Sequence, residues 1–347
     1  MKMKKLPGTD VSVSVICAGT MNWGTFNTEP EAHEQLDYAI SQGVNFIDTA
    51  EMYPIPPKKE LQGLTEMYVG AWLKKQKRDS LVVASKVAAS SNIQTRYVPE
   101  GGHTIYDRKN ILAAIDGTLE RLQTDYVDIY QIHWPERETN FFGPRGVESL
   151  GSLGTPIEET LEALSEVVKA GKVRYIGISN ETPWGLNEYL RLAREKGLPR
   201  VVTIQNQYSL INRTFEVGLA EICLREGVGL LPYSPLSKGV LTGKYLGGVI
   251  PPGSRFDYAK RDSDRYNPAH AQVAIQKYAD LARSNGMEPA VMALAWVNQR
   301  SFVTANIIGT RSMEQIKTDV ATANITLSED VLEAIKIIYR EHPDPTA

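Results

Sequence analysis

The chain has 347 residues, of which 42% are hydrophobic and 23% charged, and its formal net charge is −3. This is the composition of an ordinary globular protein with enough apolar residues for a large core. The slight negative charge and the lack of a strongly basic block argue against nucleic acid or an anionic membrane as the main partner.

The two cysteines, Cys17 and Cys223, are too few for a disulfide framework or a zinc cluster. No apolar run approaches the ~20 residues of a membrane-spanning helix, and serines interrupt the apolar residues near the N-terminus, unlike in a signal peptide. We therefore expect a cytoplasmic protein with no membrane partner. The sequence leaves its oligomeric state open.

Eight short apolar runs rich in β-branched residues alternate with amphipathic helical stretches. The runs begin at Val13, Val44, Leu81, Val127, Arg174, Val201, Gly227 and Ala305. This alternation implies crossover connections and buried parallel strands. Eight units favour an α/β fold with a closed (β/α)8 TIM barrel, because closure leaves no exposed sheet edge. An open doubly wound sheet is the alternative.

Segments outside these units complete the predicted fold. Residues 7–10 read as the turn of a hairpin that plugs the N-terminal end of the barrel. Long loops at 87–106, 134–154 and 236–266 follow strands and are expected on the C-terminal face. Residues 328–341 predict an extra terminal helix with Ser328 as its N-cap. No linker is evident, so we expect one domain over 1–347.

Two helices carry capping signals in the sequence. Thr28 stands three residues before Glu31 as an N-cap, and a glycine at 43 supplies the stop. Thr155, followed by a proline and then Glu158, repeats this pattern, with the proline at the first helical position. The sequence therefore predicts that these two helices begin directly after Thr28 and Thr155.

Polar residues end three of the predicted strands. Asp48 ends the second strand, Lys86 the third and His133 the fourth. Carboxyl ends of parallel strands meet at one rim of a barrel, and Tyr53 follows Asp48 closely enough to fold back over that rim. Each residue alone is more often structural, as a cap, an ion-pair partner or a core histidine. Their convergence on one rim favours a catalytic site.

The four side chains suit acid catalysis of hydride addition to a carbonyl, which places negative charge on the carbonyl oxygen. A free tyrosine has a pKa of ~10, and we expect the ammonium of Lys86 to lower the pKa of Tyr53. Asp48 would pair with Lys86 and hold it in place. His133 would donate a hydrogen bond to the carbonyl oxygen and orient it.

The chain resembles the aldo-keto reductase superfamily over nearly its whole length. The resemblance rests on VNFIDTAEMY at 44–53, LVVASKV at 81–87, VDIYQIHWP at 127–135, KVRYIGISN at 172–180, YSPLSKGVLTGKY at 233–245 and IIGT at 307–310. It looks most similar to the bacterial Tas-like branch and more distantly to the potassium-channel β-subunits. The resemblance implies reduction of an aldehyde or ketone to the alcohol by NADPH, with Asp48, Tyr53, Lys86 and His133 catalytic and the proton from Tyr53.

The resemblance also implies a cofactor site. Ser179, Asn180 and Gln205 match positions that bind the nicotinamide carboxamide, and Tyr233 matches the aromatic residue that stacks on the nicotinamide ring. The pyrophosphate would lie along Ser234, Pro235, Leu236, Gly239 and Lys244, which offer backbone donors and one cation. Further cofactor positions are Thr20, Met21, Gly309 and Thr310.

At the adenosine end, Arg255, Arg311 and Gln315 match positions near the phosphate that distinguishes NADPH from NADH, and an arginine fork suits phosphate geometry. Relatives often carry Glu-Asn near the adenine, whereas Thr318-Asp319 stands here. Asp319 keeps an acceptor for the adenine amino group and loses the amide.

A substrate pocket is expected where aromatic residues fall on the rim loops. An apolar small-molecule aldehyde or ketone would suit such a pocket, although some of these rings are expected only to pack the loops onto the barrel. The pocket residues are Trp23, Tyr53, Tyr97, Trp134 and Phe141.

Two other functions remain compatible with the sequence. The chain could bind NADPH and turn over slowly as a cofactor sensor, or a barrel lyase or isomerase could form an imine on Lys86. No G-x-G-x-x-G follows a strand, the stretch at 239–244 is one residue short of a P-loop, and no histidine pair has zinc spacing. We therefore expect no Rossmann site and no metal.

Overall fold

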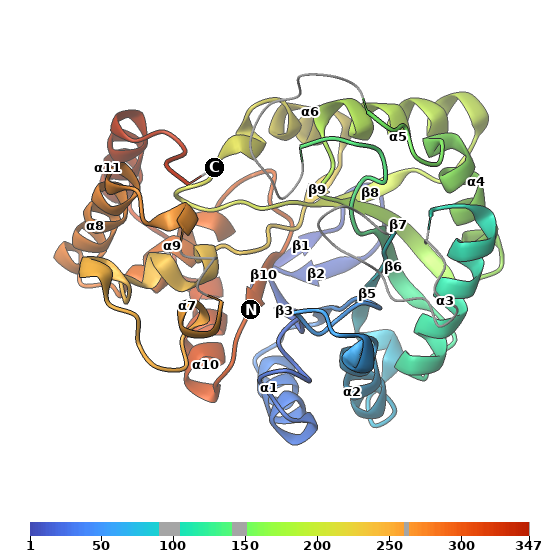
Figure 1. The fold of residues 1–347 in the computed structure, drawn as a ribbon, viewed down its shortest axis with the longest axis horizontal. Coiled ribbons are helices and arrows are strands. Elements are labelled where there is room, and N and C mark those ends of the chain that lie inside the picture. Colours follow the sequence, from blue (N-terminus) through green and yellow to red (C-terminus); the bar gives the residue numbers. More distant parts are fainter. Residues whose placement is uncertain (90–104, 141–150, 260–263, 347) are drawn as a thin grey trace.

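A computed structural model describes residues 1–89, 105–140, 151–259 and 264–346 of the chain (Figure 1). Eight parallel strands form one sheet in the order β10-β3-β4-β5-β6-β7-β8-β9. The strands are β3 (Ile16–Gly19), β4 (Phe46–Asp48), β5 (Val82–Val87), β6 (Val127–Ile132), β7 (Val173–Ser179), β8 (Val201–Gln205), β9 (Gly229–Leu230) and β10 (Asn306–Gly309).

The sheet closes between β9 and the segment that leads into β10. The backbone N–H of Leu230 donates to Phe302 O at 2.9 Å, and Thr304 donates to Leu230 O at 2.8 Å. Further up the seam, Ile307 donates to Pro232 O at 3.1 Å. The predicted (β/α)8 barrel is therefore confirmed, and the open doubly wound sheet is wrong.

Helices surround this barrel, and a second group of helices lies to one side of it (Figure 1). Those around the barrel are α1 (Glu29–Ser41), α2 (Leu64–Leu73), α3 (Arg108–Leu122), α4 (Ile157–Lys169), α5 (Pro183–Lys196) and α6 (Leu219–Glu226). Those to the side are α7 (Arg255–Tyr258), α8 (Ala269–Ser284), α9 (Pro289–Asn298), α10 (Met313–Ala321) and α11 (Glu329–Glu341). The predicted terminal helix is α11, where the Ser328 hydroxyl accepts from the Val331 N–H.

Short 3₁₀ turns connect several of these elements. They are η1 (Lys59–Leu61), η2 (Arg78–Ser80), η3 (Thr214–Glu216), η4 (Ser237–Thr242), η5 (Leu246–Gly248) and η7 (Thr322–Asn324). In the part of the chain that the structure describes, no helix is both long and apolar enough to cross a bilayer.

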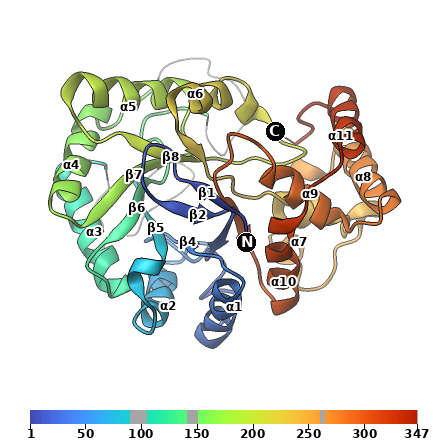
Figure 2. The same cartoon turned by 180° about the vertical axis from the view of Figure 1, so that it is seen from behind.

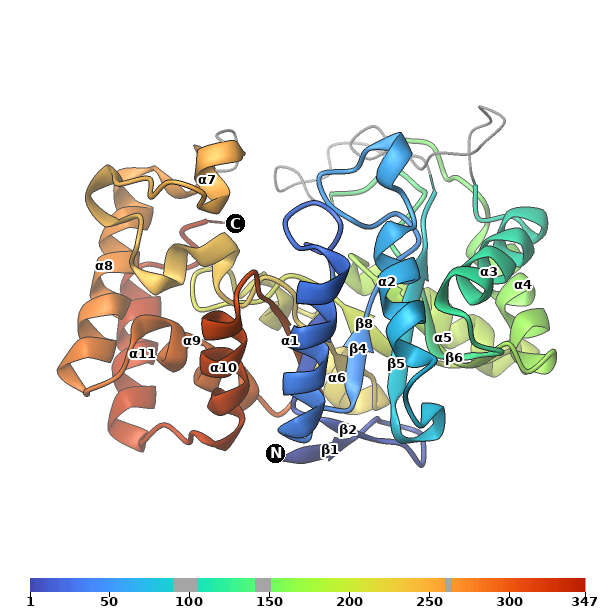
Figure 3. The same ribbon diagram turned by 90° about the horizontal axis from the view of Figure 1, so that it is seen from below.

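An antiparallel hairpin of β1 (Met3–Lys5) and β2 (Ser12–Ser14) closes one end of the barrel (Figures 2 and 3). Leu6 and Val13 are fully buried and pack with Phe46, Ile129 and other side chains of the barrel interior. The predicted plug is confirmed. The run that begins at Val13 is however not one strand, because Val13 belongs to the hairpin and the barrel strand begins at Ile16.

Of the two predicted helix starts, the one after Thr28 is confirmed and the one after Thr155 is wrong. The Thr28 N–H donates to the Glu31 carboxylate at 2.8 Å, so the reciprocal bond expected of a capping box is present. The prediction for Thr155 is wrong, because Pro156 has an extended backbone and is itself the N-cap of α4. The helix starts one residue later, which moves Glu158 to the second helical position and out of the capping geometry.

Candidate active site

The four residues predicted at the strand ends converge on one rim of the barrel. Asp48 ends β4, Lys86 lies near the end of β5, and His133 follows β6, while Tyr53 lies in the loop after β4. The ammonium of Lys86 donates to Asp48 Oδ2 at 2.6 Å and to the Thr49 carbonyl at 2.8 Å. It lies 3.2 Å from the Tyr53 hydroxyl. The expected juxtaposition of a carboxylate, an ammonium and a phenol is therefore present.

The second oxygen of Asp48 is held by two amides. Gln205 Nε2 donates to Asp48 Oδ1 at 2.8 Å, and Gln131 Nε2 donates to the same atom at 3.1 Å. Sequence reasoning missed Gln131. The period of two along a strand places it on the same face as His133, and this was the signal that could have found it.

Burial and the neighbouring charges together set the protonation states of Tyr53 and Lys86. Burial raises the pKa of Tyr53 above its ordinary value; Lys86 opposes this rise and Asp48 adds to it. The expected net lowering of the Tyr53 pKa is therefore wrong, because the loss of hydration outweighs the attraction of the ammonium. Burial alone would lower the pKa of Lys86, but Asp48 and Tyr53 together raise it. Near neutral pH the pair consists of a neutral phenol and an ammonium.

The imidazole of His133 stands across from these groups. Its ring centre lies 5.7 Å from that of Tyr53, in an edge-on arrangement, and 4.8 Å from that of Trp134. Burial first, and Lys86 second, lower the pKa of His133 well below its ordinary value. Among the described residues, Nδ1 of this ring has no hydrogen-bond partner. The ring is therefore neutral and can donate from only one nitrogen.

The residues predicted at the nicotinamide lie beside this group. Tyr233 OH donates to Asn180 Oδ1 at 2.7 Å, and Asn180 Nδ2 donates to the His133 carbonyl at 2.9 Å. Asn180 has a left-handed φ of 56°, which asparagine tolerates better than most residues. Ser179 Oγ donates to the Gln205 carbonyl at 2.7 Å. These contacts hold the ends of β7 and β8 and the turn after β9 together.

The segment predicted at the pyrophosphate forms a tight turn. Left-handed φ angles recur along it, at Ser234 (53°), Ser237 (48°), Lys238 (59°) and Gly239 (90°). A Cβ on Gly239 would lie 2.9 Å from Lys244 Nζ, so glycine lets the ammonium lie against the turn. Burial first, and the charge of Arg311 second, lower the pKa of Lys244. Pro235 and Leu236 complete the turn.

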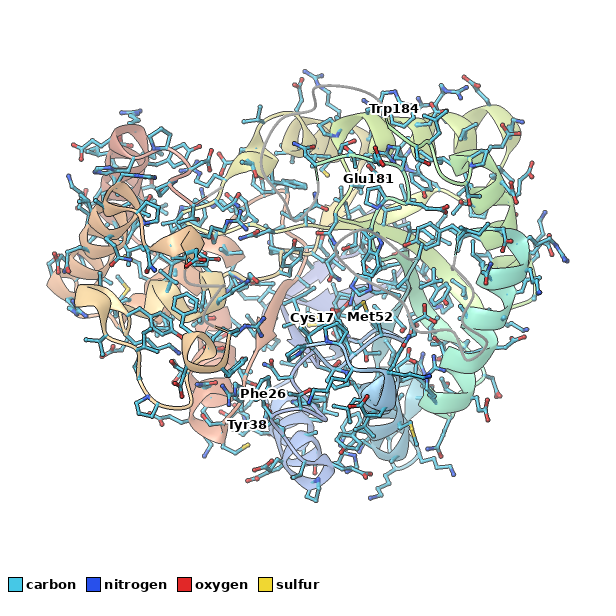
Figure 4. The ribbon with its side chains drawn as sticks, in the orientation of Figure 1. Cys17, Phe26, Tyr38, Met52, Glu181 and Trp184 are labelled. Carbon is cyan, nitrogen blue, oxygen red and sulfur yellow. The ribbon has the colours of Figure 1, made fainter. Side chains whose placement is uncertain are left out.

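The predicted phosphate-binding arginines meet two aromatic rings. Phe26, labelled in Figure 4, lies 4.5 Å from Tyr258 between ring centres. The guanidinium of Arg311 lies 4.3 Å from the Phe26 ring centre and 5.5 Å from that of Tyr258. Arg255 lies 5.6 Å from the Tyr258 ring centre, and Gln315 accepts from the Arg311 N–H at 2.9 Å. The loop after β3, α7 and the loop after β10 therefore come together around Arg311.

The remaining predicted cofactor positions lie at or just after the ends of β3 and β10 and on α10. Thr20 Oγ1 donates to the Asp48 carbonyl at 3.0 Å, and Thr310 Oγ1 donates to Gln35 Oε1 at 2.7 Å. The Met21 carbonyl accepts from the Ile55 N–H at 3.1 Å. Gly309 ends β10 and is exposed. Asp319 on α10 is buried, and burial raises the pKa of its carboxyl to about 7.

The predicted substrate-pocket residues do not all belong to one cluster. Trp134 packs with Tyr53, Ala50, Met52 and Ala88 in a small buried cluster at the rim. Trp23 belongs to the larger core instead, and its carbonyl accepts from Thr65 at 2.6 Å. Tyr97 and Phe141 lie outside the described residues. Within the ranges that are described, no group of three or more acidic, histidine or cysteine side chains is placed to hold a metal ion.

A barrel with this rim is the framework of a family of carbonyl-active oxidoreductases. The family model described as "Aldo/keto reductase family" matches residues 15–340, and the chain therefore belongs to this family. It is 48% identical to protein tas of Escherichia coli, with 99% of both chains covered. It is 33% identical to the uncharacterized oxidoreductase YrpG of Bacillus subtilis (98% of this chain, 96% of that one). It is 29% identical to the NADH-specific methylglyoxal reductase of E. coli (94% and 95%).

Proposed function

We propose that this protein reduces an aldehyde or ketone to the alcohol with NADPH and that Tyr53 supplies the proton. The observation that carries the proposal is the buried chain of contacts from Asp48 through Lys86 to the Tyr53 hydroxyl. It offers a neutral phenol, already hydrogen-bonded to an ammonium, at the rim where substrate would enter. NADPH, when bound, supplies the hydride.

Each of the four side chains has a distinct task in this proposal. Tyr53 donates its proton to the carbonyl oxygen as negative charge develops there. Lys86 stays charged and stabilises the phenolate that remains. Asp48 holds Lys86 in place. His133, as a neutral ring, donates a hydrogen bond that orients the carbonyl oxygen.

The same observations weigh against an imine on Lys86. An imine-forming lysine has to lose its proton before it attacks a carbonyl. Lys86 instead has a raised pKa, is fully buried, and donates to Asp48 and to the Thr49 carbonyl. Reduction with Lys86 as a permanent cation therefore fits the site better than imine chemistry does.

The residues at the proposed cofactor site fit a nicotinamide dinucleotide phosphate. Lys244 lies against the turn at 234–239, and Arg311 is close enough for its charge to lower the pKa of Lys244. Neither cation has a carboxylate within ion-pair distance among the described residues. Two neighbouring cations without a carboxylate form an attractive site for phosphate groups. Lys244 would hold the pyrophosphate, and Arg255 and Arg311 the ribose phosphate.

The choice of NADPH over NADH in this proposal rests on Arg255 and Arg311. A relative of 29% identity is named as specific for NADH, so the coenzyme of this chain has to be argued from its own residues. In this chain Arg311 packs against the rings of Phe26 and Tyr258, and its backbone N–H is bonded to Gln315. A guanidinium fixed in this way suits a phosphate monoester, which NADH lacks.

The proposed substrate is an apolar carbonyl compound of small size. Trp134 packs next to Tyr53, and Met52 and the half-buried Met21 and Ile55 complete an apolar surround. The low cysteine content and negative charge fit an enzyme of the cytoplasm that acts on such metabolites without a nucleic acid or membrane partner.

The direct test is loss of NADPH absorbance with a panel of aromatic and aliphatic aldehydes and ketones, with NADH run in parallel. Steady oxidation of NADPH that disappears in Tyr53→Phe supports the proposal. Tight NADPH binding without turnover, seen as quenching of cofactor fluorescence, would instead favour a cofactor sensor. Oxidation of NADH alone would refute the coenzyme assignment while leaving the reduction intact.

A further inference from the structure

Gln131 lies inside the barrel directly beside Lys86, with which it is paired in the register of β5 and β6. It is fully buried. Its Nε2 donates to Asp48 Oδ1 at 3.1 Å, and its Oε1 accepts from Gln205 Nε2 at 3.3 Å. A carboxylate can only accept hydrogen bonds, so the amide nitrogen of Gln131 has to face Asp48. The orientation of this amide is therefore fixed by its surroundings.

The neighbouring strands leave room for this side chain. Gly177 on β7 pairs with Gln131 in the register. A Cβ on Gly177 would lie 2.4 Å from Thr203 Oγ1 and 3.0 Å from Gln131 Cγ. The space above Gly177 is therefore shared by the side chains of Gln131 and Thr203. A residue larger than glycine at position 177 would occupy the space through which the Gln131 side chain reaches Asp48.

The contact acts on the charge that Lys86 and Tyr53 experience. Asp48 uses Oδ2 for Lys86 and Oδ1 for the two amides. Amide donors draw negative charge towards Oδ1, and their dipoles place a partial positive charge near the pair. The titratable groups described around Tyr53 are Lys86, Asp48, His133, Tyr233 and the buried Cys17. Of these, Gln131 contacts the carboxylate that opposes ionisation of Tyr53.

We propose that Gln131 is a positioning residue that holds Asp48 and limits its negative field at Tyr53, which keeps the phenol acidic enough to give up its proton. The statement about proton donation rests on the proposed function. The effect of Gln131 on Tyr53 is a property of the protein alone and can be measured without turnover.

The test follows the Tyr53 phenol by NMR in cofactor-free protein labelled with ¹³C at tyrosine Cζ. The Tyr53 signal is the one that disappears in Tyr53→Phe. The titration is followed upward from about pH 10, the ordinary tyrosine pKa, because burial raises the pKa of Tyr53 above that value. Gln131→Leu should shift the Tyr53 titration further upward by about one pH unit, the order expected when a charged group loses one hydrogen bond. Thr203→Val, which removes the neighbouring buried hydroxyl, should not shift it.

Gln131→Asn provides a second variant, because it keeps a buried amide but withdraws the donor from Asp48. It should shift the titration in the same direction as Gln131→Leu. In turnover assays both variants should move the basic limb of the kcat–pH profile upward and lower kcat several-fold, with the Kd for NADPH unchanged. A Tyr53 signal that behaves as in the wild type in both variants would overturn the role of Gln131. Failure of the proposed function would appear separately, as a wild-type protein that does not oxidise NADPH.

Discussion

The phenol of Tyr233 donates a hydrogen bond to Asn180 Oδ1 at 2.7 Å and thereby joins the turn after β9 to the end of β7. The amide nitrogen of Asn180 continues the link to the His133 carbonyl. One amide therefore connects the ring proposed to lie against the nicotinamide with the backbone of the histidine proposed to orient the carbonyl. The two halves of the site are coupled through Asn180.

Tyr233→Phe should keep the ring and break this connection. Loss of one buried hydrogen bond costs about 1 to 3 kcal/mol, so we expect a lower melting temperature and NADPH binding weakened about tenfold. Binding is measured by fluorescence quenching. Tyr278→Phe is the matched control, because its buried hydroxyl has no hydrogen-bond partner among the described residues. Equal effects in both variants would contradict the coupling.

Tyr53→Phe should remove the proton donor and spare the cofactor site. We expect kcat to fall ~10²-fold or more, the usual size of an acid–base contribution. The Kd for NADPH should stay within about twofold, since Tyr53 contacts Lys86 rather than the cations proposed to bind phosphate. Near-normal turnover in this variant would remove Tyr53 from its proposed role.

The rate of reduction should be nearly independent of pH across the neutral range. The reaction needs a protonated Tyr53, whose pKa is raised, and a neutral His133, whose pKa is lowered. The acid limb of the profile should therefore lie well below the ordinary histidine value of ~6.5, and the basic limb above the ordinary tyrosine value of ~10. The measurement is kcat at saturating substrate and NADPH. An inflection near pH 6.5 that His133→Asn abolishes would show that the histidine is not held neutral.

Arg311→Ala should discriminate between the two coenzymes. A charge-assisted hydrogen bond contributes about 1.5 to 3 kcal/mol, so the Kd for NADPH should rise about tenfold or more while that for NADH stays unchanged. Arg340→Ala on the exposed side of α11 serves as the control for loss of a surface charge. An equal loss of affinity for NADPH and NADH would indicate that Arg311 only packs against Phe26.

Asp319→Asn should stabilise the protein above neutral pH. Burial raises the pKa of this carboxyl from 3.8 to about 7, so the folded state binds its proton more tightly than the unfolded state does. The associated stability is complete below pH ~4 and is lost as the pH rises through about 7. The variant should therefore melt a few degrees above the wild type at pH 8 and gain less at pH 5. A melting difference independent of pH would contradict the assignment.

The positions of the strand-end residues could be predicted because parallel barrels place all carboxyl ends at one rim. Asp48, Lys86 and His133 met as expected for this reason. Gln131 precedes His133 by two residues, and only the period of two along the strand indicates that its amide faces inward. The pKa of Tyr53 could not be predicted either, because its direction depends on the balance between burial and the charge of Lys86.

Local signals were less reliable than the pattern of strands. A threonine before a proline suits an N-cap, but the backbone angles of Pro156 decide where α4 begins. Between Val13 and the barrel strand at Ile16 stand only Ser14 and Val15, so no glycine or proline marks the change from hairpin to barrel. The single domain over 1–347, the roles of the site residues and the coenzyme preference stay predictions.

The hairpin of β1 and β2 has a consequence for where protons and product leave and enter the site. Leu6 and Val13 fill the lower end of the barrel, so packed side chains separate Tyr53 from the solvent at that end. Under the proposed reaction, a proton lost by Tyr53 returns across the same rim through which the alcohol leaves. Return of the proton to Tyr53 and departure of the alcohol therefore take place at the same rim.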